Sequence, residues 1–357
     1  MKSLTIKIVA LLCCLVVGTL SVIFLFQQSE KSIQYTNSFI RQFPPHFATE
    51  VNQADLGFNS YYFSGIEDST IYLGNITAPL QMLLLDTLLQ RKEQFFIELD
   101  EKDLPFHKPQ VKVYDTNFYV YEGSIPYLFQ GSVFDWKASL KINSGNFFSQ
   151  VVPIDSVRNA VRYIAPQSGE NIIGVYDLRD TADVNLSSTL LEKQLDGIID
   201  TDGTLLYNKQ LDLLCYMHRY RNEFTVFKPS LALLYRGKTI DTISKSTIEL
   251  KEIKGKSIKT FASPPLIVNK SSATYGNFLF NHSMLRGQFE LAVNWKNASI
   301  IDVYDLVGKR YVLSFYVYHI GNSKMKSFTV DDHTLYALVG DKIVKYQLRS
   351  ELLKKYE

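Results

Sequence analysis

The sequence has little cysteine, and its few cysteines cannot crosslink a folded domain. Only three occur in 357 residues, and Cys13 and Cys14 lie within the apolar run 8–26. Cys215 is then alone in the remainder of the chain, which excludes an intradomain disulfide. The stability of a soluble region of about 330 residues must therefore come from a buried core, and a chain of that length can form one.

Neither sign of charge dominates the sequence. The chain has 38 Lys and Arg against 36 Asp and Glu, and without Lys2 and Lys7, which precede the apolar run, 36 basic residues balance 36 acidic ones. No long basic run occurs. Nucleic acid is therefore not an expected partner.

Linear catalytic motifs are absent as well. The chain has no G-x-S-x-G elbow, H-E-x-x-H motif, P-loop or paired-cysteine motif. Its six histidines are scattered at positions 46, 107, 218, 282, 319 and 333, without the spacing of a metal centre. These absences favour a binding protein over an enzyme, although a ring-shaped fold can assemble catalytic groups from distant segments.

One long apolar run is present, at residues 8–26. At about 1.5 Å per residue it covers roughly 28 Å, the hydrocarbon thickness of a bilayer. The run continues through residues 22–26 without an A-x-A-like site, which favours a retained anchor, while Gly18, Thr19 and Ser21 keep cleavage as the alternative. Lys2 and Lys7 predict that residues 1–7 are cytoplasmic and that the rest faces outward, in the periplasm of a bacterial inner-membrane protein.

The part after the anchor is rich in strand-forming residues, with 22 Tyr and 23 Phe. The pattern is clearest near the C-terminus, where turn formers separate predicted strands at 288–295, 299–306, 311–319, 326–330, 334–339 and 343–348. Strands at such regular, short spacing are typical of sandwiches, barrels and propellers.

Length and repetition favour a β-propeller. Blades of roughly 40 to 50 residues would divide the soluble region into about six. Similar sequence segments recur at 69–75, 117–122, 171–178, 299–306 and 333–340. The segment GVYDL at 174–178 nearly matches DVYDL at 302–306. We therefore predict an all-β fold, a propeller of about six blades behind one transmembrane helix. A two-domain all-β arrangement is the structural alternative.

The domain boundaries follow from this division. We expect a cytoplasmic N-terminus at 1–7, a transmembrane signal-anchor at 8–26, a stalk at 27–50, a propeller at 51–348 and a charged, helix-prone tail at 349–357. Pro44 and Pro45 oppose a continuous helix through the stalk. Residues 80–99 fit either a helix or two strands divided near residues 90–92.

The segment 194–242 has the most chemical interest. It resembles uncharacterised, membrane-anchored propeller proteins of Bacteroidetes, which are associated with a DG...TDG...Y...YRN.F...GKTIDT-like line in one blade. The matching residues are Asp196, Gly197, Asp202, Gly203, Tyr207, Tyr220, Arg221, Asn222, Phe224 and 239–242. The resemblance implies a propeller at a membrane and brings no known reaction.

Three carboxylates in this segment, Asp196, Asp200 and Asp202, are candidate Ca²⁺ ligands, since Asp-x-Asp-Gly opens one class of calcium loop. The glutamate that such a loop needs downstream is missing from 197–207. An Asp-Gly hairpin turn explains the same residues without a metal, and no other cofactor is expected.

The second candidate site is His218, Arg219 and Arg221, which lie among aromatic residues. Arginine binds carboxylate or phosphate with two hydrogen bonds, so these side chains could hold an anionic or sugar-like ligand. An ordinary strand with one solvated face is the structural alternative. In that case Arg221 could pair with Asp241 as an internal brace.

The sequence thus predicts an extracytoplasmic propeller that binds or scaffolds a protein partner at the membrane, to which residues 8–26 attach it. An anchored hydrolase or lyase with its site in the propeller channel is the alternative function. Confinement to a membrane raises the effective concentration of partners held nearby, which favours the first function.

Overall fold

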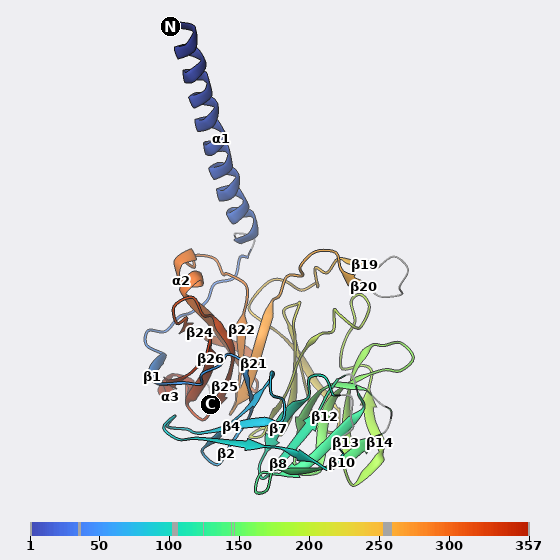
Figure 1. The fold of residues 1–357 in the computed structure, drawn as a ribbon. Helices are drawn as coiled ribbons and strands as arrows, with labels where there is room; N and C mark the ends of the chain where they lie inside the picture. Colours follow the sequence, from blue (N-terminus) through green and yellow to red (C-terminus); the bar gives the residue numbers. More distant parts are fainter. Residues whose placement is uncertain are drawn as a thin grey trace.

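The computed structural model describes residues 2–34, 37–101, 106–123, 125–143, 145, 147–252 and 259–355. Most of them form six antiparallel sheets, and helix α1 projects from one end of the body that these sheets build (Figure 1). The sheets are the blades of a six-bladed β-propeller, as the spacing of strands in the sequence predicts.

The blades follow one another along the chain. Blade 1 consists of β2 (Tyr61–Glu67), β3 (Thr70–Asn75), β4 (Gln81–Asp86) and β5 (Lys92–Phe96). Blade 2 consists of β7 (Gln110–Tyr114), β8 (Asn117–Tyr121), β9 (Tyr127–Ser132) and β10 (Lys137–Asn143), with β6 (Glu98–Leu99) parallel to β10. Blade 3 consists of β11 (Phe148–Pro153), β12 (Arg158–Ile164), β13 (Asn171–Asp177) and β14 (Asp180–Ser187).

Blade 4 consists of β15 (Gly203–Asn208), β16 (Leu213–His218), β17 (Glu223–Phe227) and β18 (Leu233–Lys238). A hairpin of β19 (Leu250–Glu252) and β20 (Lys259–Phe261) precedes blade 5, which consists of β21 (Asn269–Tyr275), β22 (Phe278–Ser283), β23 (Ala298–Asp305) and β24 (Arg310–Tyr318). Blade 6 consists of β25 (Met325–Asp331), β26 (Thr334–Val339), β27 (Lys342–Leu348) and β1 (Ala48–Asp55).

Strand β1 closes the ring. It is the outermost strand of the last blade and pairs antiparallel with β27, from Ala48 opposite Leu348 to Asp55 opposite Lys342. Both ends of the propeller sequence therefore share one sheet. The chain passes from β1 directly into β2 of blade 1, and a shared hydrophobic cluster packs the first and last blades together.

The core is divided among the blade interfaces. Each of six hydrophobic clusters joins two neighbouring blades, including the pair formed by blade 6 and blade 1. In the interface of blades 1 and 2, the Trp136 ring stacks on Phe118 and Phe95. The aromatic richness of the sequence thus fills the wedge between adjacent sheets, and Cys215 is buried in the interface of blades 4 and 5.

An aspartate at the end of the third strand caps the following turn in three blades. Asp86 accepts hydrogen bonds from the N–H groups of residues 90 and 91, Asp177 from that of residue 179, and Asp305 from those of residues 307 and 308. GVYDL and DVYDL therefore mark the third strands of blades 3 and 5. The repeat in the sequence is a repeat of blade structure.

Helix α1 (Lys2–Gln34) contains one segment, Ile6–Phe26, that is long and apolar enough to cross a membrane, and a signal sequence has the same character. The large apolar side chains of this segment are exposed. Thr19 and Ser21 donate to carbonyl groups four residues back, so their hydroxyl groups are satisfied within the helix.

The structure differs from the predicted stalk at 27–50. The helix continues through Gln34, and the described residues after it pack on the propeller, with Phe39 and Phe47 buried. Residue Ala48 already begins β1. Pro44 and Pro45 lie ten residues or more beyond the end of the helix and so do not terminate it, and the described chain between α1 and β1 packs on the propeller.

Arg41 attaches residues 37–47, the linker between α1 and β1, to blade 5. Its guanidinium is fully buried and donates to both oxygens of Asp302, at 2.6 and 3.1 Å, and to Glu290 at 2.6 Å. It also donates to the Leu285 carbonyl and the Ser283 hydroxyl. Burial disfavours the charge, but Asp302 and Glu290 outweigh it and raise the pKa of Arg41. The linker is therefore held by a buried ion-pair network.

The structure decides two local predictions. Residues 80–99 are extended, as β4, β5 and β6, with the turn between β4 and β5. The predicted strand at 288–295 is wrong: this segment is a loop and the start of α2 (Ala292–Asn297). Glu290 accepts hydrogen bonds from Arg41, 249 residues away, and from the indole of nearby Trp295, and these bonds hold the segment outside the sheets. A short helix, α3 (Ser350–Leu353), lies in the predicted tail.

Candidate functional site

An open channel of about 830 Å³ runs between the first strands of the blades. Strands β2, β7, β11, β15, β21 and β25 form its wall, because the first strand of each blade lies innermost. Side chains alternate along a strand, so each inner strand presents some of its residues to this space. The site is therefore composed of six segments that are distant in the sequence.

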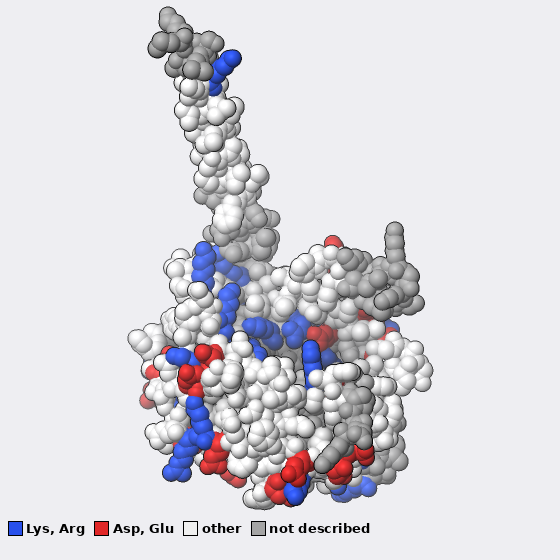
Figure 2. All heavy atoms as spheres, in the orientation of Figure 1, with Lys and Arg blue, Asp and Glu red and all other residues white. Residues whose placement is uncertain are grey.

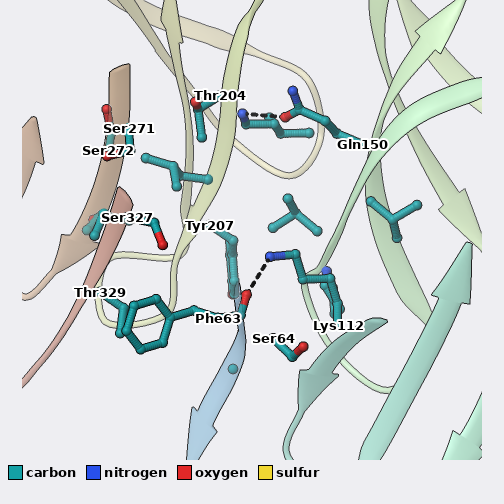
Figure 3. Close-up of a pocket in the computed structure, with 18 of the residues that line it drawn as sticks. Phe63, Ser64, Lys112, Gln150, Thr204, Tyr207, Ser271, Ser272, Ser327 and Thr329 are labelled. Carbon is teal, nitrogen blue, oxygen red and sulfur yellow. Dashed lines mark hydrogen bonds between the residues drawn. The ribbon is translucent and has the colours of Figure 1, made fainter. Parts of the chain in front are cut away.

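One polar residue from each inner strand forms what we call the polar layer of the channel. Its members are Ser64, Lys112, Gln150, Thr204, Ser271 and Ser327 (Figure 3). Gln150 on β11 bridges to β15, since its side-chain amide donates to the Gly203 carbonyl and accepts from the Leu205 N–H. The bridge fixes Gln150, and it ties blades 3 and 4 together beside the channel.

Lys112 is the cation of the polar layer. Its Nζ donates to the Phe63 carbonyl at 3.3 Å, and Figure 3 shows the side chain extending from β7 into the space between the inner strands. Burial lowers the pKa of this ammonium. Among the described contacts of Lys112, no carboxylate balances its charge.

Two guanidinium groups and one carboxylate form the mouth of the channel. Asp202 lies 2.5 Å from Nη1 of Arg162 and 2.8 Å from Nε of Arg219. The ladder of β15 and β16 places them: Gly203 pairs with His218, so Asp202 and Arg219 lie side by side at its end. Lys270 also lies near the mouth. Burial and the positive charges of Lys324 and Arg219 lower the pKa of Lys270.

The mouth lies on the side of the propeller where α1 joins. The Arg219 carbonyl accepts from the N–H groups of Val268 and Asn269, and Val268 packs against Phe39 of the linker. Figure 2 shows Lys and Arg gathered around a hollow on this side of the propeller, below α1. The basic mouth and helix α1 therefore lie on one face of the propeller.

The far end of the channel has balanced charge. Glu67 pairs with Lys209 at 3.3 Å, and Lys209 also lies over the Tyr114 ring. Burial, together with Asp332, raises the pKa of Asp331. The two ends thus differ, with excess positive charge only toward the mouth and Lys112.

The structure separates the three residues of the predicted ligand site. Arg219 lines the channel, whereas His218 and Arg221 are fully buried between strands. Arg221 donates to Glu223 at 2.9 Å and to two main-chain carbonyls, and its Nη2 lies 3.0 Å from Nε2 of His218. Burial and Arg221 lower the pKa of His218, so the ring is neutral.

Arg221 is therefore an internal brace, but its carboxylate partner differs from the one expected. Asp241 accepts from the Thr239 hydroxyl and the Ile243 N–H, and burial raises its pKa. Glu223 is the carboxylate partner of Arg221, because β17 begins at Glu223, directly after the turn that contains the arginine.

The three predicted calcium ligands do not form a metal site in the structure. Asp200 is buried and accepts from four successive backbone N–H groups, 194–197. Asp196 accepts from two more, and Asp202 pairs with arginines at the mouth. Within the described ranges, no group of three or more His, Cys, Asp or Glu is arranged to hold a metal ion. Turn formation explains Asp196 and Asp200.

Sequence reasoning missed the polar layer. Its one available signal is a polar residue set within an apolar strand, such as Lys112 between Val111 and Val113. The same pattern is expected for a side chain that faces solvent on the outside of a sheet. Only the closure of the ring places this side chain in the channel.

The fold and the channel define a six-bladed propeller with an open, polar central cavity. No family model matches the sequence, and no curated protein matches it. Among solved structures, the chain is similar to a member of the DUF4221 family from Bacteroides vulgatus, with 13% identity, a TM-score of 0.51, and coverage of 86% of this chain and 99% of that one. The expected likeness to a Bacteroidetes propeller is thus confirmed for the fold.

Two further solved structures have lower TM-scores. Virginiamycin B lyase from Staphylococcus aureus has 11% identity, a TM-score of 0.48, and coverage of 85% of this chain and 100% of that one. The calcium-binding protein regucalcin from Agrobacterium tumefaciens has 11% identity, a TM-score of 0.46, and coverage of 87% and 96%. At these identities the likenesses concern the fold alone.

Proposed function

We propose that this protein is a membrane-anchored, extracytoplasmic binding module whose central channel receives a ligand or a segment of a membrane partner. The observation that carries the proposal is the open channel with its polar layer and its basic mouth on the side of the anchor. Concave sites with a few placed polar groups are the usual binding sites of proteins.

The anchor supports this function by geometry. In the proposed orientation Ile6–Phe26 spans the inner membrane and the propeller lies in the periplasm. From Phe26 to the end of α1 the helix adds about 12 Å, and the three residue steps to Asn37 add at most about 11 Å. Asn37 bonds to the Arg286 carbonyl on the mouth side. The mouth would then face the lipid surface at short range.

Binding fits the channel better than hydrolysis or elimination does. Two of the three carboxylates in the described lining are engaged in ion pairs, Glu67 with Lys209 and Asp202 with Arg162. No histidine or cysteine is among the lining residues that the structure describes.

Site-specific crosslinking in the native membrane tests this function. A photoreactive residue replaces Lys324, at the mouth side, or Ser156, in the turn between β11 and β12 at the opposite end, in the full-length chain. We expect a membrane or periplasmic partner to crosslink from position 324 and not from position 156, with α1 alone as the background control. Equal yields from both positions, or none from position 324, would contradict the proposed function.

A further inference from the structure

The channel has more cationic than anionic groups where a ligand would enter. At the mouth, Arg162 and Arg219 share one carboxylate, Asp202. Deeper, Lys112 contacts the Phe63 carbonyl and has no acidic partner among its described contacts. A buried charge without a partner is costly, so its presence on a cavity wall calls for a compensating ligand.

Hydrogen-bond donors complement this charge. The hydroxyl oxygens of Ser271 and Ser327 are buried and have no hydrogen-bond partner among the described residues. They lie on β21 and β25, across the channel from Lys112 (Figure 3). A serine hydroxyl and a lysine ammonium can both donate to the same acceptor group. Hydrogen-bond donors therefore lie on three inner strands around the channel, β7, β21 and β25.

We propose that the channel binds a phosphate group, with the Lys112 ammonium as its central contact, Ser271 and Ser327 as neutral donors, and Arg219 guiding entry at the mouth. This inference rests on the proposed function and names its ligand class. A tetrahedral phosphate offers acceptors in several directions, which suits donors on opposite walls better than a planar carboxylate does. The phosphate is carried by a free small molecule or by a lipid headgroup reached through the mouth.

Titration of the full-length protein with inorganic phosphate tests the inference. The protein is purified in a phosphate-free, lipid-free detergent solution, and binding is followed by calorimetry. The variant Lys112→Met keeps the length of the side chain and removes the charge, and Lys141→Met, on an exposed lysine of β10, is its matched control. We expect Lys112→Met to weaken phosphate binding at least tenfold, Arg219→Met to weaken it several-fold, and Lys141→Met to leave it unchanged.

Loss of binding in Lys112→Met must not come from unfolding, and the structure predicts that it does not. Methionine at this position relieves the burial of an unpaired charge, so the variant should melt at or above the temperature of the wild-type protein. Phosphate binding that is equal in wild type and Lys112→Met, or absent in the wild type, would overturn the inference.

A second pair of measurements separates the two sources of phosphate. The protein is placed in nanodiscs of the phosphate-free lipid digalactosyldiacylglycerol alone or with phosphatidylglycerol, and inorganic phosphate is titrated into each. A lipid source predicts that phosphatidylglycerol reduces the apparent affinity for inorganic phosphate in the wild type and not in Arg219→Met. A free source predicts the same affinity in both discs. A neutral solute could bind to the wild type and not to Ser327→Trp while phosphate does not bind at all. In that case the binding function stands and only the phosphate assignment falls.

Discussion

At the scale of single residues, Arg41 makes five side-chain hydrogen bonds that join the linker to blade 5. Removing one partner from a buried ion pair leaves the other charge unpaired, at a cost of about 3–5 kcal/mol. We therefore expect Arg41→Ala to lower the free energy of unfolding by about that amount in urea denaturation of the detergent-solubilised protein. The exposed Arg91 supplies the control Arg91→Ala, which should stay within about 0.5 kcal/mol of wild type. Similar stability of the two variants would contradict the role of Arg41.

His282 gives a prediction for acid stability. Burial, assisted by Lys270 and His319, lowers its pKa to about 3 from 6.5. Because the unfolded chain takes up this proton near its ordinary pKa and the folded protein does not, the stabilising contribution is present above pH 6.5 and is lost as pH falls toward 3.

The test is the slope of stability against pH between 6 and 4. Replacing His282 by glutamine should reduce this slope by up to about 1.4 kcal/mol per pH unit. The control is His107→Gln, which removes an exposed histidine and should leave the slope at its wild-type value. The assignment fails if the two variants have the same slope.

At the scale of elements, the connection from β16 to β17 has two arginines with different tasks. Arg221 is buried and braces the turn through Glu223, while Arg219 is about a third exposed and lines the mouth. We expect Arg221→Met to lower the melting temperature by several degrees without changing phosphate affinity, and Arg219→Met to do the reverse. Thermal scans and calorimetry on both variants check this, and an exchange of the two effects would refute the assignment.

The elements also show what the sequence can predict. Strand spacing and turn residues predict the blades because each strand needs a local pattern of apolar residues and a local stop. The segment 288–295 has such a pattern and is not a strand, because Glu290 bonds to Arg41 from the other end of the chain. Burial of the linker at 37–47 was missed for the same reason, since its partners lie in blade 5.

The candidate site was harder to predict than the blades. Arg219 was recognised by its residue type and does line the channel. Lys112, Ser271 and Ser327 come from three blades, and no linear motif joins them. A propeller assembles its channel from one strand per blade, so residues that are far apart in sequence meet only when the ring closes.

At the scale of the whole molecule, helix α1 and the channel mouth lie on the same side of a rigid ring. In the proposed orientation, confinement to a membrane surface would raise the effective concentration of ligands and partners held there. The six interfaces between blades leave little freedom for the channel to change shape, so selectivity must come from charge and hydrogen bonds at the mouth and in the polar layer.

The most direct test of the account is native mass spectrometry of the full-length protein released from bacterial membranes in mild detergent. The account predicts a small bound species on the wild type and its loss in Ser327→Trp, which places an indole ring in the polar layer of the channel. It predicts retention of the species in Ser156→Trp, at the end away from the mouth, with the folding of each variant checked by its melting temperature. A bound species that remains on folded Ser327→Trp, or a wild-type protein that carries no bound species, would contradict the claim that the channel is the binding site.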